Sequence, residues 1–214
     1  MKQDLKKGFT RVENGDKNRA YQLRIQLKHL KPAIYRDVLV DPATPLPKLH
    51  RIIQAAMGWE DVHLHGFALP LKTESYWRVP GLRRFEKPSA DGWGEPAQNE
   101  SRFTVADLLQ APKSKLLYMY DFGDDWEHTV TLSAIVETNV PLPHLLKAQY
   151  GCPPEDCGGV PGLSHWAEVW HTPLAEDHAI AKSMFGDQEP GSLDFEALQK
   201  AVRKLQPKVK RKVD

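Results

Sequence analysis

Residues 21–28 alternate between apolar and polar side chains, and this alternation constrains the fold more than any other feature of the chain. Tyr21, Leu23, Ile25 and Leu27 are the apolar members, and polar residues stand between them. Successive side chains of a strand point to opposite faces, so the pattern predicts a strand with one buried face. A short link then leads into residues 34–40, which are rich in β-branched and aromatic side chains and predict the antiparallel return of a hairpin.

Helix signals follow this hairpin. Thr44 and Pro45 favour a helix start, an apolar stripe occupies 46–57, and Gly58 suits a helix end. Thr104 with Asp107 resembles the capping box of a short helix. Further strands are expected at 62–69, at 116–120 and after Trp126, and further helices at 164–171, 173–185 and 194–205. These elements predict an α+β fold with a largely antiparallel sheet, flanking helices and a helical C-terminal third.

The chain of 214 residues divides into three parts by composition. Residues 1–19 are polar without a sustained period and predict a mobile arm, and residues 206–214 predict a disordered basic tail. Residues 20–205 are expected to form a single domain. Within it, 72–102 lacks a clear period and is interpreted as a long excursion from the fold, of the kind that often carries function.

Charge and hydropathy limit the classes of partner. Lys and Arg total 29 against 28 Asp and Glu, a net charge of +1, so any nucleic-acid site must be a local patch. No apolar run reaches the roughly 20 residues of a membrane span, and the first residues lack the apolar centre of a signal peptide. We therefore expect a cytoplasmic protein with no membrane partner.

The stretch DFGDDWEH, from Asp121 to His128, combines four acids with a tryptophan and a histidine. Gly123 and the acids beside it favour a hairpin turn. Strand alternation after the turn places Trp126 and His128 on the core side, together with Val130 and Leu132. A buried imidazole needs a carboxylate, a backbone carbonyl or a metal as its partner, so we expect the partner of His128 to reveal the function.

Three histidines and several acids could assemble into a metal site. His63 and His65 stand two residues apart on the expected strand 62–69 and would share a face. Imidazoles suit zinc, and carboxylates suit magnesium or manganese. An open coordination position would activate water for hydrolysis of a phosphodiester or a peptide. The alternative is that the histidines are core groups and that the aspartates shape the turn. The candidate ligands are His63, His65, His128, Asp121 and Glu155, with Asp124, Glu127 and Asp156 as further oxygen donors.

The loop GCPPEDCGG, residues 151–159, holds both cysteines of the chain. Four residues separate Cys152 from Cys157, a spacing that permits chelation of a metal. Cys157 could instead be a nucleophile beside a base, or both could belong to a structural loop stiffened by its prolines. The candidate catalytic residues are therefore Cys157, His128 and Asp121, and all three interpretations of the loop stay open.

Arginines and aromatic residues gather within the excursion 72–102. Such residues pair with phosphates and stack on bases, but they are also enriched at protein interfaces. A nucleic acid and a protein therefore both stay open as partners. The contact candidates are Trp77, Arg78, Arg83, Arg84, Phe85 and Trp93, with the tail 208–212.

Four motifs together resemble one known family. They are YQLRIQLKHLKPAIYRDVLV, LHRIIQAAMGWEDVHLHGF, YMYDFGDDWEH and GCPPEDCGG, and the resemblance spans about 20–200. The chain resembles the plasmid pRiA4b ORF-3-like family, which includes proteins labelled as transposon passenger TnpR. The resemblance implies an α+β domain with a largely antiparallel sheet, found on chromosomes, plasmids and mobile elements, and it implies no established activity.

Two functional hypotheses follow. The first is an accessory protein of a mobile element that acts through a polar cleft where the strand 62–69, the hairpin turn and the cysteine loop converge, with or without a divalent metal. The second is a non-catalytic interaction module. An enzyme would line an open pocket with its polar side chains, whereas an interaction module would bury them as satisfied pairs.

Overall fold

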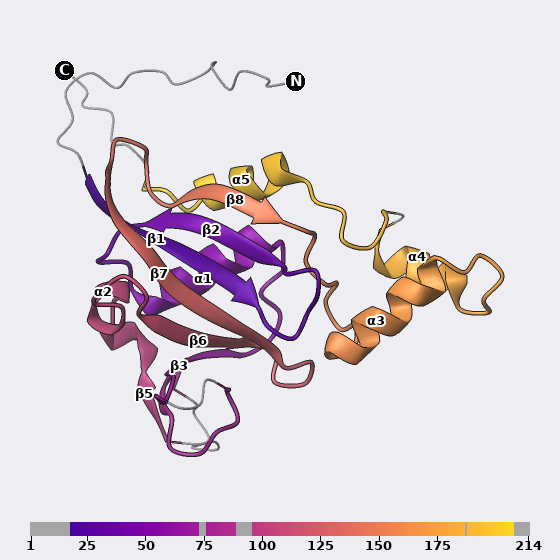
Figure 1. Ribbon diagram of the computed structural model, residues 1–214, viewed down its shortest axis with the longest axis horizontal. Helices are drawn as coiled ribbons and strands as arrows, with labels where there is room; N and C mark the ends of the chain where they lie inside the picture. Colours follow the sequence, from indigo (N-terminus) through magenta and orange to yellow (C-terminus); the bar gives the residue numbers. More distant parts are fainter. Residues whose placement is uncertain (1–17, 73–75, 89–95, 187, 208–214) are drawn as a thin grey trace.

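The computed structural model describes residues 18–72, 76–88, 96–186 and 188–207, and it shows an α+β fold around one eight-stranded sheet (Figure 1). The strand order is β5-β4-β3-β6-β7-β1-β2-β8, and every neighbouring pair is antiparallel except β4 with β5. The strands are β1 (Asn18–Leu27), β2 (Tyr35–Val40), β3 (His65–Leu69), β4 (Arg83–Glu86), β5 (Ala97–Asn99), β6 (Lys115–Tyr120), β7 (Trp126–Thr138) and β8 (His144–Gln149).

Helices pack on one face and at one end of this sheet. Helix α1 lies across the main core, α5 packs on α1 and β8, and α3 with α4 forms a pair beyond the strand ends (Figure 1). None of the helices in the described ranges is long and apolar enough to cross a membrane. The helices are α1 (Leu46–Met57), the 3₁₀ turn η1 (Glu100–Arg102), α2 (Val105–Leu108), α3 (Gly159–Trp170), α4 (His178–Met184) and α5 (Phe195–Arg203).

The first hairpin and the first helix confirm the sequence prediction. Strands β1 and β2 pair antiparallel, with Leu23 opposite Val38, and both side chains are buried. Helix α1 follows Pro45 and ends at Gly58, which has a φ of 99°. A left-handed residue at this place satisfies the last carbonyls of the helix, and glycine adopts it without strain. The capping box of Thr104 and Asp107 is also present at the start of α2.

The hairpin of β6 and β7 confirms the alternation predicted for DFGDDWEH. Trp126 and His128 have no exposed surface and belong to the side of the sheet that α1 covers. The opposite side is covered locally by a second, smaller core that includes Trp77 and Met119. Glu127 points into this side, where it accepts from Lys28 Nζ at 2.7 Å and from the Trp77 backbone amide at 3.0 Å. Both sides of the sheet are therefore buried near the turn.

Several expected boundaries are wrong. The excursion 72–102 contains η1 and the strands β4 and β5, which extend one edge of the sheet, and the opposite edge strand, β8, occupies 144–149, where no strand was expected. Both segments lack alternation because edge strands are short and partly exposed. The strand expected at 62–69 begins only at His65. Strand β1 includes Asn18, whereas the strand was expected from Tyr21, and the expected arm and tail otherwise fall on 1–17 and 208–214, outside the described residues.

Candidate functional site

The segment between α1 and β3 brings His63 to the surface of the sheet. Asp61 has a φ of 60°, so the chain turns sharply after the helix. The backbone amide of Val62 donates to the Tyr120 hydroxyl at 3.2 Å, which anchors the segment on β6. Val62 and Leu64 are 59% and 73% exposed, whereas the side chain of His63 is only 26% exposed. The imidazole is thus turned inward between two outward-facing apolar residues.

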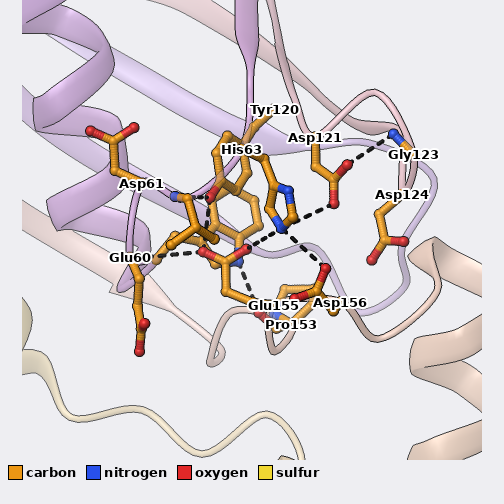
Figure 2. Close-up of polar contacts among 12 residues, drawn as sticks. Glu60, Asp61, His63, Tyr120, Asp121, Gly123, Asp124, Pro153, Glu155 and Asp156 are labelled. Atoms are coloured by element: carbon orange, nitrogen blue, oxygen red, sulfur yellow. Dashed lines mark hydrogen bonds and ion pairs between the residues drawn. The ribbon is translucent and has the colours of Figure 1, made fainter.

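Three acids surround the His63 ring, and we call these four residues the His63 cluster. The Nε2 atom lies 3.1 Å from Asp156 Oδ1, 3.6 Å from Asp121 Oδ2 and 3.9 Å from Glu155 Oε2. Figure 2 shows the imidazole pointing toward all three carboxylates. The acids come from two segments distant in sequence, the turn between β6 and β7 and the loop after β8. Only the tertiary fold brings them to His63.

Glu155 and Asp121 each have one carboxylate oxygen that accepts hydrogen bonds from neighbouring groups. Glu155 Oε1 accepts from the Tyr120 hydroxyl and from the Glu60 backbone amide, each at 2.9 Å, and Asp121 Oδ1 accepts from the Gly123 amide at 2.8 Å (Figure 2). Burial and the hydrogen bond to Glu155 raise the pKa of Tyr120, so its hydroxyl stays a donor. Two other atoms of the cluster, His63 Nε2 and Glu155 Oε2, are buried and have no hydrogen-bond partner among the described residues.

The cysteine loop is docked so that Glu155 and Asp156 reach the cluster. Trp59 Nε1 donates to the Pro153 carbonyl at 2.9 Å, and the Gly158 amide donates to Asp124 Oδ2 at 3.0 Å. Gly159 has a φ of 68°, and a Cβ there would lie 2.5 Å from the Asp124 carbonyl oxygen. Glycine is therefore required where the loop meets the DFGDDWEH turn. Asp124 holds the loop instead of joining the cluster.

Sequence and fold comparisons agree on the relatives of this chain. The pattern of the plasmid pRiA4b ORF-3-like protein family matches residues 19–201. The chain belongs to this family. It is 34% identical over 197 residues to the uncharacterized protein y4hQ of Sinorhizobium fredii, a match that covers 89% of this chain and 94% of the relative. It also resembles the crystal structure of MM3350 from Methanosarcina mazei Go1, a protein of unknown function, with a TM-score of 0.70, 30% identity and coverage of 87% and 99% of the two chains.

In this member of the pRiA4b ORF-3-like family, His65 lies apart from the His63 cluster. Its Nε2 atom lies 3.0 Å from Glu100 Oε2, and its ring stacks on that of His50 with the centroids 3.4 Å apart. The expectation that His63 and His65 share a strand face is wrong, because His63 precedes the strand and alternation does not apply to it. The only group of at least three converging ligand atoms within the described ranges consists of His63, Asp121 and Asp156.

His128 does not meet a carboxylate. Its Nδ1 atom lies 2.9 Å from the Trp126 carbonyl oxygen, and the edge of the Trp59 ring covers it. Burial lowers the pKa of His128 to about 3, so the imidazole is neutral. The partner of His128 Nδ1 is therefore the backbone, whereas Nε2 is buried and has no hydrogen-bond partner among the described residues. The side chain has no exposed surface from which to exchange a proton with a ligand. Among the alternatives raised by the sequence, the structure favours a core histidine.

The two thiols are in apolar surroundings. Burial raises the pKa of Cys157 to about 12, and it also raises the pKa of Cys152. Both groups are therefore protonated at neutral pH, whereas a nucleophile must be a thiolate. Cys157 is buried, and its thiol faces the Gly159 carbonyl oxygen at 4.0 Å. These surroundings favour the structural interpretation of the loop over a nucleophilic one.

A second polar cluster, centred on His50, was not predicted from the sequence. His50 lies 2.6 Å from Asp61 Oδ1 through Nε2 and 2.9 Å from the Tyr118 hydroxyl through Nδ1, and Gln54 also donates to that hydroxyl. Burial lowers the pKa of His50. One signal could have found it: His50 stands four residues after Leu46 and three before Ile53, and so lies on the buried stripe of α1.

Two open grooves meet at His63. The first, of about 1330 Å³, extends over β3 and β4, and we call it the basic groove because Arg51, Arg78, Arg84 and Lys87 line it. The second, of about 780 Å³, extends along the cysteine loop, and we call it the acidic groove because Glu60, Glu155, Asp156 and Glu189 line it.

The predicted contact residues divide between groove and core. Trp77, Arg78 and Arg84 line the basic groove, where the Arg84 guanidinium lies over the Trp77 ring. Arg83 is exposed and lies against Phe85, and Phe85 is buried in the core. Trp93 and the tail 208–212 lie outside the described residues.

Proposed function

We propose that this protein binds a divalent metal ion at the His63 cluster and uses it to activate water for hydrolysis. The observation that carries the proposal is a pair of buried atoms that form no hydrogen bond, His63 Nε2 and Glu155 Oε2, which lie 3.9 Å apart beside two further carboxylates. Native proteins give nearly every buried polar atom a partner. An imidazole nitrogen and several carboxylate oxygens gathered around one point are the donor set of a zinc or manganese site.

The distances support this proposal. Metal–ligand bonds of about 2.1 Å place neighbouring ligand atoms about 3.0 Å apart in an octahedron and about 3.4 Å apart in a tetrahedron. The three oxygens lie 3.1, 3.6 and 3.9 Å from His63 Nε2, so small side-chain adjustments would give either geometry. Tyr120 and the Glu60 amide hold Glu155 from behind, as outer-shell groups orient metal ligands.

The charge balance points the same way. Asp121, Glu155 and Asp156 contribute three negative charges, and the described residues place no Lys or Arg in ion-pair contact with them. A protonated His63 would offset one of these charges, whereas a divalent ion would offset two and could use the lone pair of a neutral imidazole. Like charges crowded together without compensation are costly, and bound cations are a common reason that proteins tolerate them.

Access to the cluster supports a chemical role beyond structural binding. His63 lines both grooves, and the side chain of Asp156 is 74% exposed. An ion held by His63, Asp121 and Glu155 would therefore have a side open to solvent, where a bound water could become a nucleophile near neutral pH. Asp156, the most exposed of the acids, is placed to complete the coordination or to accept a proton from that water.

The rival function is a non-catalytic interaction module. It is favoured by the pairs His65–Glu100 and Lys28–Glu127, whose side chains are mostly buried and contact each other at hydrogen-bonding distance. The His63 cluster lacks this character, because His63 Nε2 and Glu155 Oε2 form no hydrogen bond and the cluster borders open grooves. Metal content therefore separates the two functions.

The test is metal binding by the wild type, His63→Ala and His65→Gln. After chelator treatment and dialysis, calorimetric titration with Zn²⁺ and Mn²⁺ should show one site in the wild type and in His65→Gln, and none in His63→Ala. His65→Gln is the matched control, because His65 is a neighbouring histidine outside the cluster. Equal binding by all three proteins, or binding by none, would refute the proposal.

A further inference from the structure

The two grooves that meet at His63 differ in charge. The lining of the acidic groove holds four acids and, among the described residues, neither Lys nor Arg. The lining of the basic groove holds four cationic side chains, from α1, from β4 and from the segments beside β4, together with Asp61, Glu86 and Glu100. A ligand that reaches the His63 cluster thus meets opposite electrostatic surroundings on its two sides.

Two acids of the basic groove, Asp61 and Glu100, are hydrogen-bonded to histidines, whereas two of its cations are exposed. Asp61 is held by His50 at 2.6 Å, and Glu100 is held by His65 at 3.0 Å and is 4% exposed. Arg51 and Lys87 are both exposed and form no ion pair with any residue that the structure describes. Two exposed cations, Arg51 and Lys87, are therefore available to a ligand in this groove.

The other cations are fixed in place. Arg78 forms a double contact with Asp125, at 2.6 and 2.8 Å, and Arg84 donates to the Trp77 carbonyl at 3.0 Å. Both guanidinium groups retain N–H donors beyond these bonds, since each carries five. Phe122 also lines the groove and packs against Trp77 with the ring centroids 6.0 Å apart, which adds an aromatic surface between the arginines and His63.

We infer that the basic groove binds a single-stranded nucleic acid, with a phosphodiester directed to the metal at the His63 cluster. This inference rests on the proposed function and names its substrate class. Arginine and lysine pair with phosphates, and aromatic rings stack on bases whatever their sequence. The volume of about 1330 Å³ exceeds the roughly 300–1,000 Å³ of small-molecule pockets, so the groove fits a strand of several nucleotides.

The acidic groove restricts a bound strand to the basic side of the His63 cluster. Four carboxylates line it, so a phosphate backbone would be repelled from it and kept on the basic side of the ion. A metal ion held by the His63 cluster would offset the negative charge of the cluster. A phosphate oxygen of a strand in the basic groove could then approach the cluster without repulsion.

The test compares two charge variants by fluorescence anisotropy with a labelled single-stranded DNA and an RNA of the same sequence, in Mn²⁺ and in EDTA. The variant Arg51→Ala/Lys87→Ala should bind the strands about tenfold more weakly at 0.1 M salt. The slope of log K against log salt should fall by about 1.4, from roughly 0.7 for each of two lost cations. The control Glu60→Gln/Glu189→Gln should bind as tightly as the wild type or more tightly, because it removes two exposed acids of the other groove.

Separate outcomes decide the two proposals. If the wild type retains metal but binds neither strand at low salt, or if both variants lose equal affinity, the groove assignment is overturned while the metal site stands. If no metal binds but the strands bind through Arg51 and Lys87, the proposed function fails and the groove assignment survives. Displacement of the strand by an equal nucleotide concentration of thymidine monophosphate would also overturn the assignment to a strand.

Discussion

Asp156→Asn tests whether the acids of the His63 cluster are a cation site or a structural ion pair. Asp156 has a φ of 55°, a conformation that asparagine adopts about as readily as aspartate. The substitution therefore keeps the size and backbone preference of the residue while removing its charge. Because its carboxylate is 3.1 Å from His63 Nε2, the two interpretations predict opposite effects on the protein without metal.

The magnitude follows from the distances. The ligand atoms of His63, Asp121 and Asp156 all lie within 4.8 Å of one another. Two like charges at that separation repel by about 3.5 kcal/mol at an effective dielectric constant of 20 and by about 0.9 kcal/mol in water. Asp156 is 74% exposed, so the lower figure applies. Asp156→Asn should therefore leave the free energy of unfolding in EDTA unchanged or raise it by about 1 kcal/mol.

Metal should reverse this order. At a free metal concentration of 100 times Kd, a single site stabilises the folded state by about 2.7 kcal/mol. For a chain of this size, that corresponds to a rise in Tm of about 5–10 °C. Loss of one ligand that weakens binding tenfold would remove about 1.4 kcal/mol of that gain.

The assay is thermal and urea unfolding of both proteins in EDTA and in excess Mn²⁺ or Zn²⁺. The wild type should gain more stability from metal than Asp156→Asn, and the variant should be at least as stable without metal. A variant that is less stable by more than about 1 kcal/mol in EDTA, with no response of the wild type to either metal, would refute the reasoning and assign Asp156 to an ion pair with His63.

Three further predictions concern the surroundings of the site. The pKa of His128 falls from about 6.5 in the unfolded chain to about 3 in the fold, so the unfolded state binds the extra proton and stability falls as pH drops below 6.5. Urea unfolding should show a loss of about 2 kcal/mol from pH 7 to pH 5, and His128→Phe should reduce this loss. Gly159→Ala should destabilise the protein more than Gly186→Ala, since both positions have a positive φ but only the first has a backbone oxygen 2.5 Å from the added Cβ; equal Tm values would contradict this. Cys157, with its pKa raised to about 12, should react with a thiol reagent at pH 8 only when urea unfolds the chain, and fast labelling of the native protein would argue for a nucleophile.

The sequence predicted the parts of the fold that depend on local periodicity. The alternation at 21–27, the stripe and ends of α1, and the inward phase of Trp126 and His128 are all confirmed. The edge strands β5 and β8 and the neighbouring short strand β4 were missed because they carry little alternation and owe their structure to the strands beside them. His63, Asp121 and Glu155 were named as candidate ligands and Asp156 as a further donor, but the sequence could not separate them from His65 and His128.

Tertiary structure alone decided which of the polar residues meet. Residue types and spacing determined the α+β class and the family of this chain, since both are read from patterns within short windows of sequence. The carboxylates that His63 meets lie 58 to 93 positions away in the sequence, and periodicity within a short window carries no information about them. The fold gives His128 a backbone carbonyl, gives His65 the carboxylate of Glu100, and leaves His63 facing three acids at the meeting point of two grooves.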